Sequence, residues 1–256
     1  MTHVRSLFGQ MCEQRRDVVG QPAGWGGGML GHSHAVSGAL VFAATAPVLP
    51  QHLWHNHLSG SEIVIGTLLT AGAALLPDLD HHNGTIANFL GPFSRALCTG
   101  VAKVSGGHRH ATHSIAFVVL AGLLTWQGVE HLGRPFTLTM VFLLLALALR
   151  ALNLCPPGKG LASWITIVAL AGGGTAVVDH WMPAAPDWLP MVVVLGCIAH
   201  LLGDFLTRQG IPLFWPLGTR FEVAIVSRTG NRMETLVLVP VMMIATVALL
   251  WFGAFA

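Results

Sequence analysis

The side chains best suited to chemistry in this 256-residue chain are histidines and acidic residues that recur in short clusters. In the HLLGD segment, His200 and Asp204 are four residues apart, so they share one helix face and can both reach one ion. In PDLDHH (residues 77–82), the proline ends a helix and is followed by Asp78, Asp80 and His81. An extended backbone there places the two aspartates on one side and His81 on the other. Such mixed oxygen and imidazole donors are typical of zinc, manganese or iron sites.

A third cluster, HRHATHS, precedes an apolar segment and contributes His108 and His113 with Arg109 between them. The fixed cation of Arg109 suits an anionic oxygen such as that of a phosphate, although it is also an ordinary anchor beside a membrane. His34 opens the first apolar segment and Glu234 the last. The predicted metal ligands are His34, Asp78, Asp80, His81, His108, His113, His200, Asp204 and Glu234.

The number of candidate ligands bears on the number of ions. A single catalytic zinc uses three protein ligands and keeps one position open, so this larger set favours two or more ions, or one ion with an outer layer of orienting carboxylates. Zinc is the favoured divalent metal, with manganese or iron as alternatives. The predicted catalytic residues are Asp80 and Glu234, either of which can act as a base where it is not a ligand, and Arg109, which binds the anionic group. Asp204 is a further candidate base. The alternative is that each motif only solvates its own helix end.

The elements that must position these residues are membrane helices. Hydrophobic residues make up 53% of the chain and charged residues only 9%, against about a quarter charged in soluble domains. Apolar stretches occur at residues 35–50, 62–77, 114–129, 136–154, 161–178, 189–203 and 235–254. We therefore predict an all-α, polytopic membrane helical bundle with about seven transmembrane segments. Several stretches are shorter than the roughly 20 residues that cross a bilayer, so the alternative is that one or two are re-entrant or buried.

The basic residues predict how the bundle is oriented. With the N-terminus in the cytoplasm, every Lys and Arg except Arg134 falls in an inside segment, within residues 5–16, 95–109, 150–159 and 208–232. This asymmetry is what the positive-inside rule requires. With this orientation, all of the clusters of candidate ligands lie at cytoplasmic helix ends. The positions of these clusters were not used to choose the orientation. The sequence thus predicts a multi-pass protein of the cytoplasmic (inner) membrane with its metal site at the inner face.

The remaining segments are polar or short. Residues 1–28 are Gly-rich and predict a disordered N-terminal tail or a mis-called start with Met29 as the true one, which leaves residues 29–256 as one membrane-embedded domain. Residues 88–104 predict a short helix on the inner membrane surface, with a plain loop as the alternative. His52, His55 and His57 lie in the first outside loop and are predicted to be interfacial histidines.

The order of the motifs resembles a known bacterial family, the inner-membrane metal-dependent hydrolases whose founding member is induced in the DNA-damage response. The resemblance covers about residues 34–240. The chain departs from the family pattern at His110, where a small residue is expected, and at His32, which is extra; neither is counted as a ligand. The matching residues are His34 and Gly38, the PDLDHH segment, His108, Arg109, Thr112, His113 and Ser114, then His200, Asp204, Thr207, Gly210, Pro212, Trp215 and Pro216, and finally Gly230 and Glu234.

The resemblance implies metal-dependent hydrolysis and, more distantly, a likeness to the zinc-dependent phospholipase C and single-strand nuclease superfamily. Together with the site's predicted depth, it predicts cleavage of a phosphoester of a lipid-like substrate at the cytoplasmic membrane face. The predicted partners are the lipid bilayer and that substrate. The alternative function is a divalent-metal transporter or a metal-sensing membrane protein, which would need ligands near the bilayer midplane. Because no Lys/Arg-rich run occurs, specific nucleic-acid binding is not expected.

Overall fold

The described part of the chain is helical, as predicted. The computed structural model describes residues 29–49, 57–82, 84–89, 91–158, 160–182, 187–223 and 233–255. The predicted tail, residues 1–28, and the loop histidines His52 and His55 lie outside these ranges. The α-helices are α2 (Met29–Thr45), α4 (Gly60–Ala73), α5 (Pro92–Ser105), α6 (Ile115–Ala151), α7 (Leu161–Trp181), α8 (Leu189–Phe205) and α9 (Val239–Leu250). Two 3-10 helices, η1 (Leu76–Asp80) and η2 (Ala111–His113), and two π-helical segments, η3 (Glu234–Leu238) and η4 (Trp251–Phe255), complete the helical elements.

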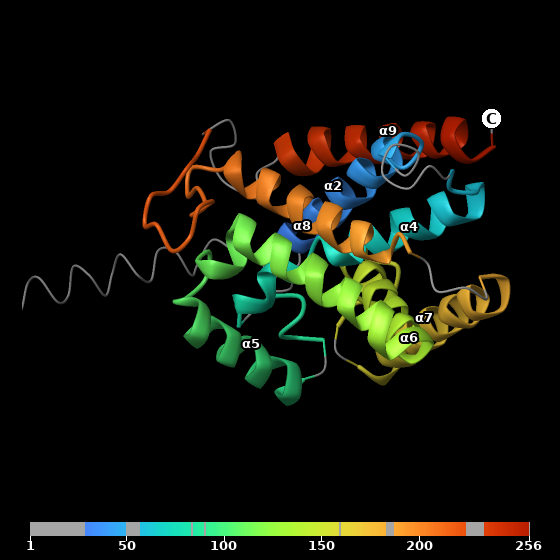
Figure 1. Ribbon diagram of the computed structural model, residues 1–256, viewed down its shortest axis with the longest axis horizontal. Coiled ribbons are helices and arrows are strands. Elements are labelled where there is room, and N and C mark those ends of the chain that lie inside the picture. The colour runs from blue at the N-terminus through green and yellow to red at the C-terminus, as the bar shows by residue number, and fades with distance from the viewer. Residues whose placement is uncertain are drawn as a thin grey trace, which may run out of the picture.

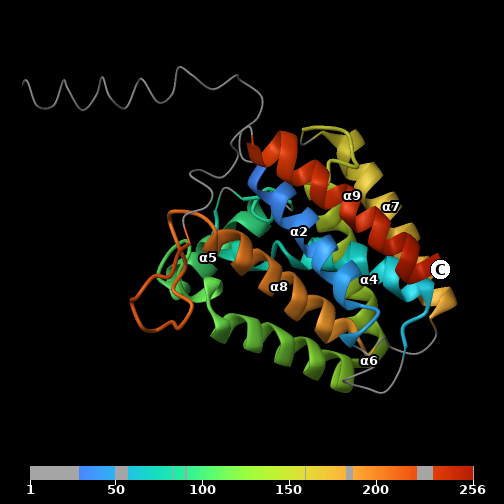
Figure 2. The same ribbon diagram turned by 90° about the horizontal axis from the view of Figure 1, so that it is seen from above.

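The centre of the bundle is formed by α2, α4, α6 and α8, which pack against one another (Figures 1 and 2). α9 lies against α2, and α7 lies against α6. α4 and α6 approach closely at Gly72, where an added Cβ would stand 1.9 Å from the carbonyl oxygen of Leu144. Small residues permit such close backbone approach between membrane helices.

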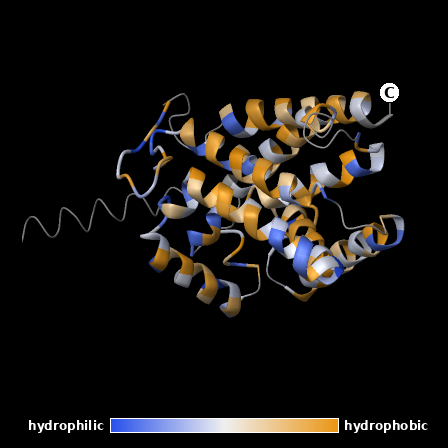
Figure 3. Cartoon of the chain, in the orientation of Figure 1, coloured by the Kyte–Doolittle hydropathy of each residue, from blue (hydrophilic) through white to orange (hydrophobic). Residues whose placement is uncertain are grey.

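Among the described residues, four helices are long and apolar enough to cross a membrane: Gly60–Asp80, Ile115–Ala151, Leu161–Trp181 and Glu234–Gly253. α8 is a shorter apolar helix. Hydrophobic residues extend over the outer faces of the bundle (Figure 3), where Leu124, Ile165 and Ile244 are exposed. Apolar surface on this scale is typical of lipid contact. The sequence predicts seven membrane crossings, and the crossings other than these four helices remain a prediction.

α6 contains two of the apolar stretches that the sequence predicts as separate segments. The helix changes direction at Gly133, whose φ of 59° is in the left-handed region that glycine adopts without strain. Beside the bend, Arg134 pairs with Asp179 at the end of α7, with Nη2 2.5 Å from Oδ1. Its Nη1 also donates to the carbonyl oxygen of Met182 at 3.1 Å. Arg134, which departs from the charge asymmetry, therefore has a local role in joining α6 to α7.

Residues 77–80 of the PDLDHH segment are helical rather than extended, which corrects the geometry expected from the sequence, and His81 after them is extended. Pro77 stands near the start of η1, where its fixed φ is compatible with a helix and its missing N–H is not needed. With about three residues per turn, Asp78 and Asp80 point in different directions instead of sharing a side. The two carboxylates therefore meet different partners.

α5 confirms that a short helix lies within the segment predicted at residues 88–104. It is bounded by Gly91 and Gly106, whose positive φ values of 62° and 93° end the helix on both sides. α5 packs against η1 and stands at the end of the bundle where the loop into α6 begins (Figure 1). Its position on a membrane surface stays a prediction.

Candidate metal centre

The candidate site lies where η1, η2, α2 and α8 meet at one end of the bundle. In the part of the chain that the structure describes, two groups of side chains are spaced as metal ligands are, and within each group one donor atom per residue lies within 4.8 Å of the others. One group is Asp78, Asp80, His108 and His113; the other is His34, His200 and Asp204. The structure thus brings together ligands that the sequence predicts from four separate stretches of the chain.

The two groups are continuous with each other. The Nε2 atom of His113 lies 3.2 Å from Nε2 of His200 and 3.3 Å from Oδ2 of Asp204. Oδ1 of Asp78 lies 3.9 Å from His113 Nε2 and 3.8 Å from His200 Nε2. The distance from His200 Nε2 to Asp204 Oδ2 is 3.6 Å. Donors about 2.0–2.2 Å from a tetrahedral ion stand about 3.3–3.6 Å apart, so the donor atoms of His113, His200 and Asp204 are spaced as around a single ion, and Asp78 stands slightly farther from both imidazoles.

In the rings of His113 and His200, the partner of Nδ1 leaves Nε2 directed at the position between the donor atoms. Nδ1 of His200 lies 2.7 Å from the carbonyl oxygen of Ala74. Because a carbonyl oxygen only accepts, Nδ1 carries the proton and the lone pair of Nε2 is free for an ion. On His113, Nδ1 lies 3.4 Å from Oδ2 of Asp80, so the same assignment holds when the ring is neutral.

The carboxylates around His113 favour a proton on both of its ring nitrogens when no ion is bound. Burial lowers the pKa of His113, but the carboxylates of Asp204 and Asp80 beside its two ring nitrogens raise this pKa to about 9. The proton on Nε2 of His113 then points toward the lone pair of His200 Nε2, 3.2 Å away. An ion bound between these nitrogens would replace that proton.

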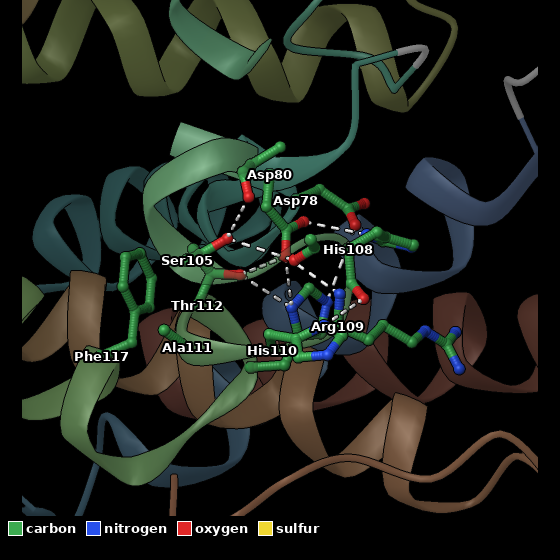
Figure 4. A network of polar contacts seen from close by, with 12 residues as sticks. Asp78, Asp80, Ser105, His108, Arg109, His110, Ala111, Thr112 and Phe117 are labelled. Atoms are coloured by element: carbon green, nitrogen blue, oxygen red, sulfur yellow. Dashed lines mark hydrogen bonds and ion pairs between the residues drawn. The ribbon is translucent and has the colours of Figure 1, made fainter. Parts of the chain in front are cut away.

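Asp80 is fully buried and accepts hydrogen bonds on both oxygens (Figure 4). Oδ1 accepts from Nδ1 of His108 at 2.9 Å. Oδ2 accepts from the backbone N–H of Arg109 at 3.0 Å and from the hydroxyl of Thr112 at 2.5 Å, and it also faces His113. The Asp80 carboxylate is therefore well placed to orient the imidazoles of His108 and His113, as carboxylates next to metal ligands do in metal sites. That Asp80 itself binds an ion stays a prediction.

Arg109 is buried and is directed at a carboxylate. Its Nη2 donates to Oδ1 of Asp204 at 2.6 Å, and its Nη1 donates to the hydroxyl of Thr207 at 3.1 Å. Its Nε is buried and has no hydrogen-bond partner among the described residues. Arg109 thus holds Asp204 in place, and one N–H of the guanidinium remains to be satisfied by a bound anion or water.

His34 completes the second group from the α2 side. Its ring stacks on the ring of His200 with centroids 3.8 Å apart, and its Nε2 lies 3.5 Å from Oδ1 of Asp204. Gly203 of α8 leaves room for this ring, since an added Cβ would stand 3.1 Å from it. Asp204 therefore faces both central imidazoles with one oxygen and His34 and Arg109 with the other.

Two predicted ligands lie outside both groups. His81 stacks on His108 with centroids 4.5 Å apart, and its pKa is lowered by burial and by the nearby imidazole of His108. Glu234 is buried and accepts a hydrogen bond from the hydroxyl of Ser33. Neither shares a metal-compatible group among the described residues, and ligation by either stays a prediction.

Some residues at the site were not recognised as functional from the sequence. Ser114 caps α6 by accepting from the N–H of Phe117, whereas Thr112 donates to Asp80. Thr207 accepts from Arg109. The contribution of Ala74 is a backbone carbonyl, for which a sequence has no signal. The position of Thr112 between two site histidines was the one available indication.

The charges around the centre favour a cation. Three carboxylates, those of Asp78, Asp80 and Asp204, converge here with one guanidinium, that of Arg109. Asp80 and Asp204 are almost completely shielded from solvent. Buried negative charge requires a nearby positive partner, which a divalent ion would supply.

Comparisons with known proteins show which family this chain is similar to. A family model described as "YdjM inner membrane protein" matches residues 29–255. "Inner membrane protein YdjM" of Escherichia coli (strain K12) is 29% identical over 208 residues, which cover 80% of this chain and 74% of that protein. The protein of the same description from Shigella flexneri matches to the same extent. No solved structure matches this chain significantly. These descriptions name a membrane location and no reaction.

Proposed function

Because this chain belongs to the YdjM inner membrane protein family, we propose that it is a membrane-bound metal-dependent hydrolase. The proposed reaction is cleavage of a phosphoester of a lipid-like substrate at the cytoplasmic membrane face. The family and the four long apolar helices establish an inner membrane protein. The reaction, the substrate class and the orientation with the N-terminus in the cytoplasm are the proposal.

The observation that carries the proposal is the spacing of four donor atoms, those of Asp78, His113, His200 and Asp204. The separations among His113, His200 and Asp204, 3.2–3.6 Å, are close to the edges of a tetrahedral coordination shell, and Asp78 lies 3.8–3.9 Å from the two imidazoles. Zinc remains the favoured ion for its fit to imidazole and carboxylate donors. A tetrahedral catalytic zinc keeps its fourth position open for water or substrate, and a fourth protein ligand would fill that position. Manganese and iron, which bind six ligands, would still have open positions and are therefore the alternatives.

A bound divalent ion would supply Lewis-acid chemistry, lowering the pKa of a water molecule toward neutrality so that it can attack an ester. Around it, Asp80 would hold His113 and Arg109 would hold Asp204. His108 is suited to accepting a proton, because its Nδ1 donates to Asp80 and its side chain is 38% exposed. The lone pair of His108 Nε2 is then available to substrate or water, as in other carboxylate–imidazole pairs. The Nε of Arg109 is the donor available to a phosphate oxygen.

Elemental analysis of the purified full chain, followed by hydrolysis assays, tests this function. We expect a divalent metal in the purified protein and turnover of a phosphodiester such as bis(p-nitrophenyl) phosphate. His113→Ala and Asp204→Asn should lose both metal and turnover. His82→Ala is the matched control, because His82 belongs to the same motif region but is exposed and outside both groups. Metal-free wild-type protein, or metal without turnover of any phosphoester tested, would contradict the hydrolase.

The alternative of a metal transporter or sensor is tested in the same preparation. Buried hydroxyls within the apolar helices, such as those of Thr70 and Thr125, donate to carbonyl oxygens of their own helix. They therefore offer no chain of ion ligands through the described part of the bundle. Zinc or manganese uptake into vesicles that contain the protein, abolished by Asp204→Asn, would favour transport over hydrolysis.

A further inference from the structure

α5 carries an apolar stripe on its outer side. Phe93, Leu97 and Val104 are 71%, 49% and 89% exposed. At about 100° per residue, these three positions fall within about 40° of one another around the helix. Cys98 and Ser105 are buried on a side of the helix about 100–120° away from the stripe. The stripe is therefore a continuous apolar face that the described part of the chain does not cover.

The charges of α5 fit an anionic surface. Arg95 and Lys103 are both exposed, and no acidic residue occurs between Gly91 and Gly106. Around the helix, Arg95 and Lys103 lie about 180° and 100° from the centre of the stripe, so α5 has an apolar side and a basic side. Such a division is typical of helices that lie in the head-group region of a bilayer. Lys and Arg side chains near anionic lipid add electrostatic attraction to the surface. The transmembrane helices differ from α5, because they are apolar around most of their circumference.

A second group of exposed apolar residues follows α8 in the chain. In the loop after α8, Phe214, Trp215 and Leu217 are 53%, 41% and 65% exposed. The loop is fastened to the site, since Arg220 donates to the backbone oxygen of Arg109 at 3.3 Å. An exposed tryptophan with neighbouring basic residues is typical of a membrane–water interface.

We propose that the α5 stripe and the loop of residues 214–217 contact lipid and insert into the head-group region of one leaflet. The occupant is the bilayer itself because this surface belongs to a chain that already spans one, and because its charges complement anionic head groups. α5 packs on η1, which carries Asp78 and Asp80, so its depth sets the depth of the metal centre. The further consequence, that a lipid-like substrate arrives laterally from that leaflet, rests on the proposed function.

Site-directed spin labelling of the full chain tests the lipid contact without any activity assay. Single cysteines would replace Leu97, Val104 and, as a control, Thr99, which is exposed on a different side of the same helix. The labelled proteins are reconstituted in vesicles of phosphatidylethanolamine and phosphatidylglycerol. We expect the labels at residues 97 and 104 to collide several-fold more with oxygen, relative to a water-soluble nickel complex, than the label at residue 99.

The labelling background would carry Cys12→Ser and Cys155→Ser, since Cys98 and Cys197 are buried. A label at Leu217→Cys tests the second element and should behave like the stripe. The double variant Arg95→Gln with Lys103→Gln should shift the α5 labels toward the nickel complex. Metal content equal to that of the unlabelled chain shows that each variant is folded.

Two outcomes would overturn the proposal. One is equal accessibility of all α5 labels to the nickel complex, which would place the whole helix in water. The other is spin–spin broadening at residue 97, which would show that a second copy of the chain covers the stripe. Either result leaves metal binding and hydrolysis intact, so failure of the lipid contact is distinguishable from failure of the proposed function.

Discussion

Replacing Asp80 by asparagine separates orientation of the metal ligands from direct ligation. Asparagine keeps the shape of the side chain, and its carbonyl oxygen can replace Oδ2, which faces three donors. Its amide would face Nδ1 of His108, which can accept after a change of tautomer. Alanine is a poorer choice, because each buried donor left without an acceptor costs about 1–3 kcal/mol.

The expected effect of Asp80→Asn follows from the lost negative charge beside His113. Loss of an orienting partner lowers metal affinity by about 10–100-fold, which corresponds to about 1.4–2.8 kcal/mol. Asp78→Asn is the comparison, since its oxygen lies among the four central donors. That variant should lose more affinity than Asp80→Asn, because a donor atom itself is replaced.

Competition with a chromophoric chelator, in detergent and at fixed pH, measures both affinities. An ion held as weakly by Asp80→Asn as by Asp78→Asn would identify Asp80 as a direct ligand and refute the orienting role. Wild-type affinity in Asp80→Asn would show that the buried network does not act on the ion at all. Circular dichroism of the metal-free variants checks that the helices are retained.

Three further predictions concern protonation, packing and topology. The pKa of His113 is raised from its ordinary value of 6.5 to about 9, so below this pH the metal affinity should rise about tenfold per pH unit, because binding displaces one proton. The same raised pKa predicts that the metal-free chain loses thermal stability as pH rises through about 9. Calorimetric affinities that do not change with pH would contradict the first of these expectations. Gly72→Ala should destabilise the chain by about 1–3 kcal/mol, because its Cβ would stand 1.9 Å from a carbonyl oxygen of α6, whereas Gly173→Ala has open space and should not; equal thermal unfolding of the two variants would count against this packing. Reporter fusions at His57 and Lys159 should report opposite sides of the membrane, and labelling of both from one side would reject the predicted topology.

Local patterns in the sequence determined the class of protein and the face of each motif. The low charged fraction and the apolar stretches predicted an all-α membrane protein, and the helices have that character. The four-residue spacing of His200 and Asp204 predicted a shared face, because a helix turns every 3.6 residues. Their ligand-type atoms are indeed 3.6 Å apart. These inferences succeed because they depend only on residues close together in the sequence and on whether a helix is surrounded by lipid or by water.

The division of roles among the ligand-type residues was decided by the tertiary structure. Asp78 and Asp80 are two positions apart, yet the turn of η1 directs one toward the central imidazoles and the other toward the loop before α6. Arg109 meets Asp204 across 95 residues of sequence, and Glu234 accepts from Ser33 of α2. Such pairings depend on how η1, α8 and the connecting loops rotate and pack against one another. No local spacing encodes that rotation, because it results from the sum of long-range contacts in the folded bundle.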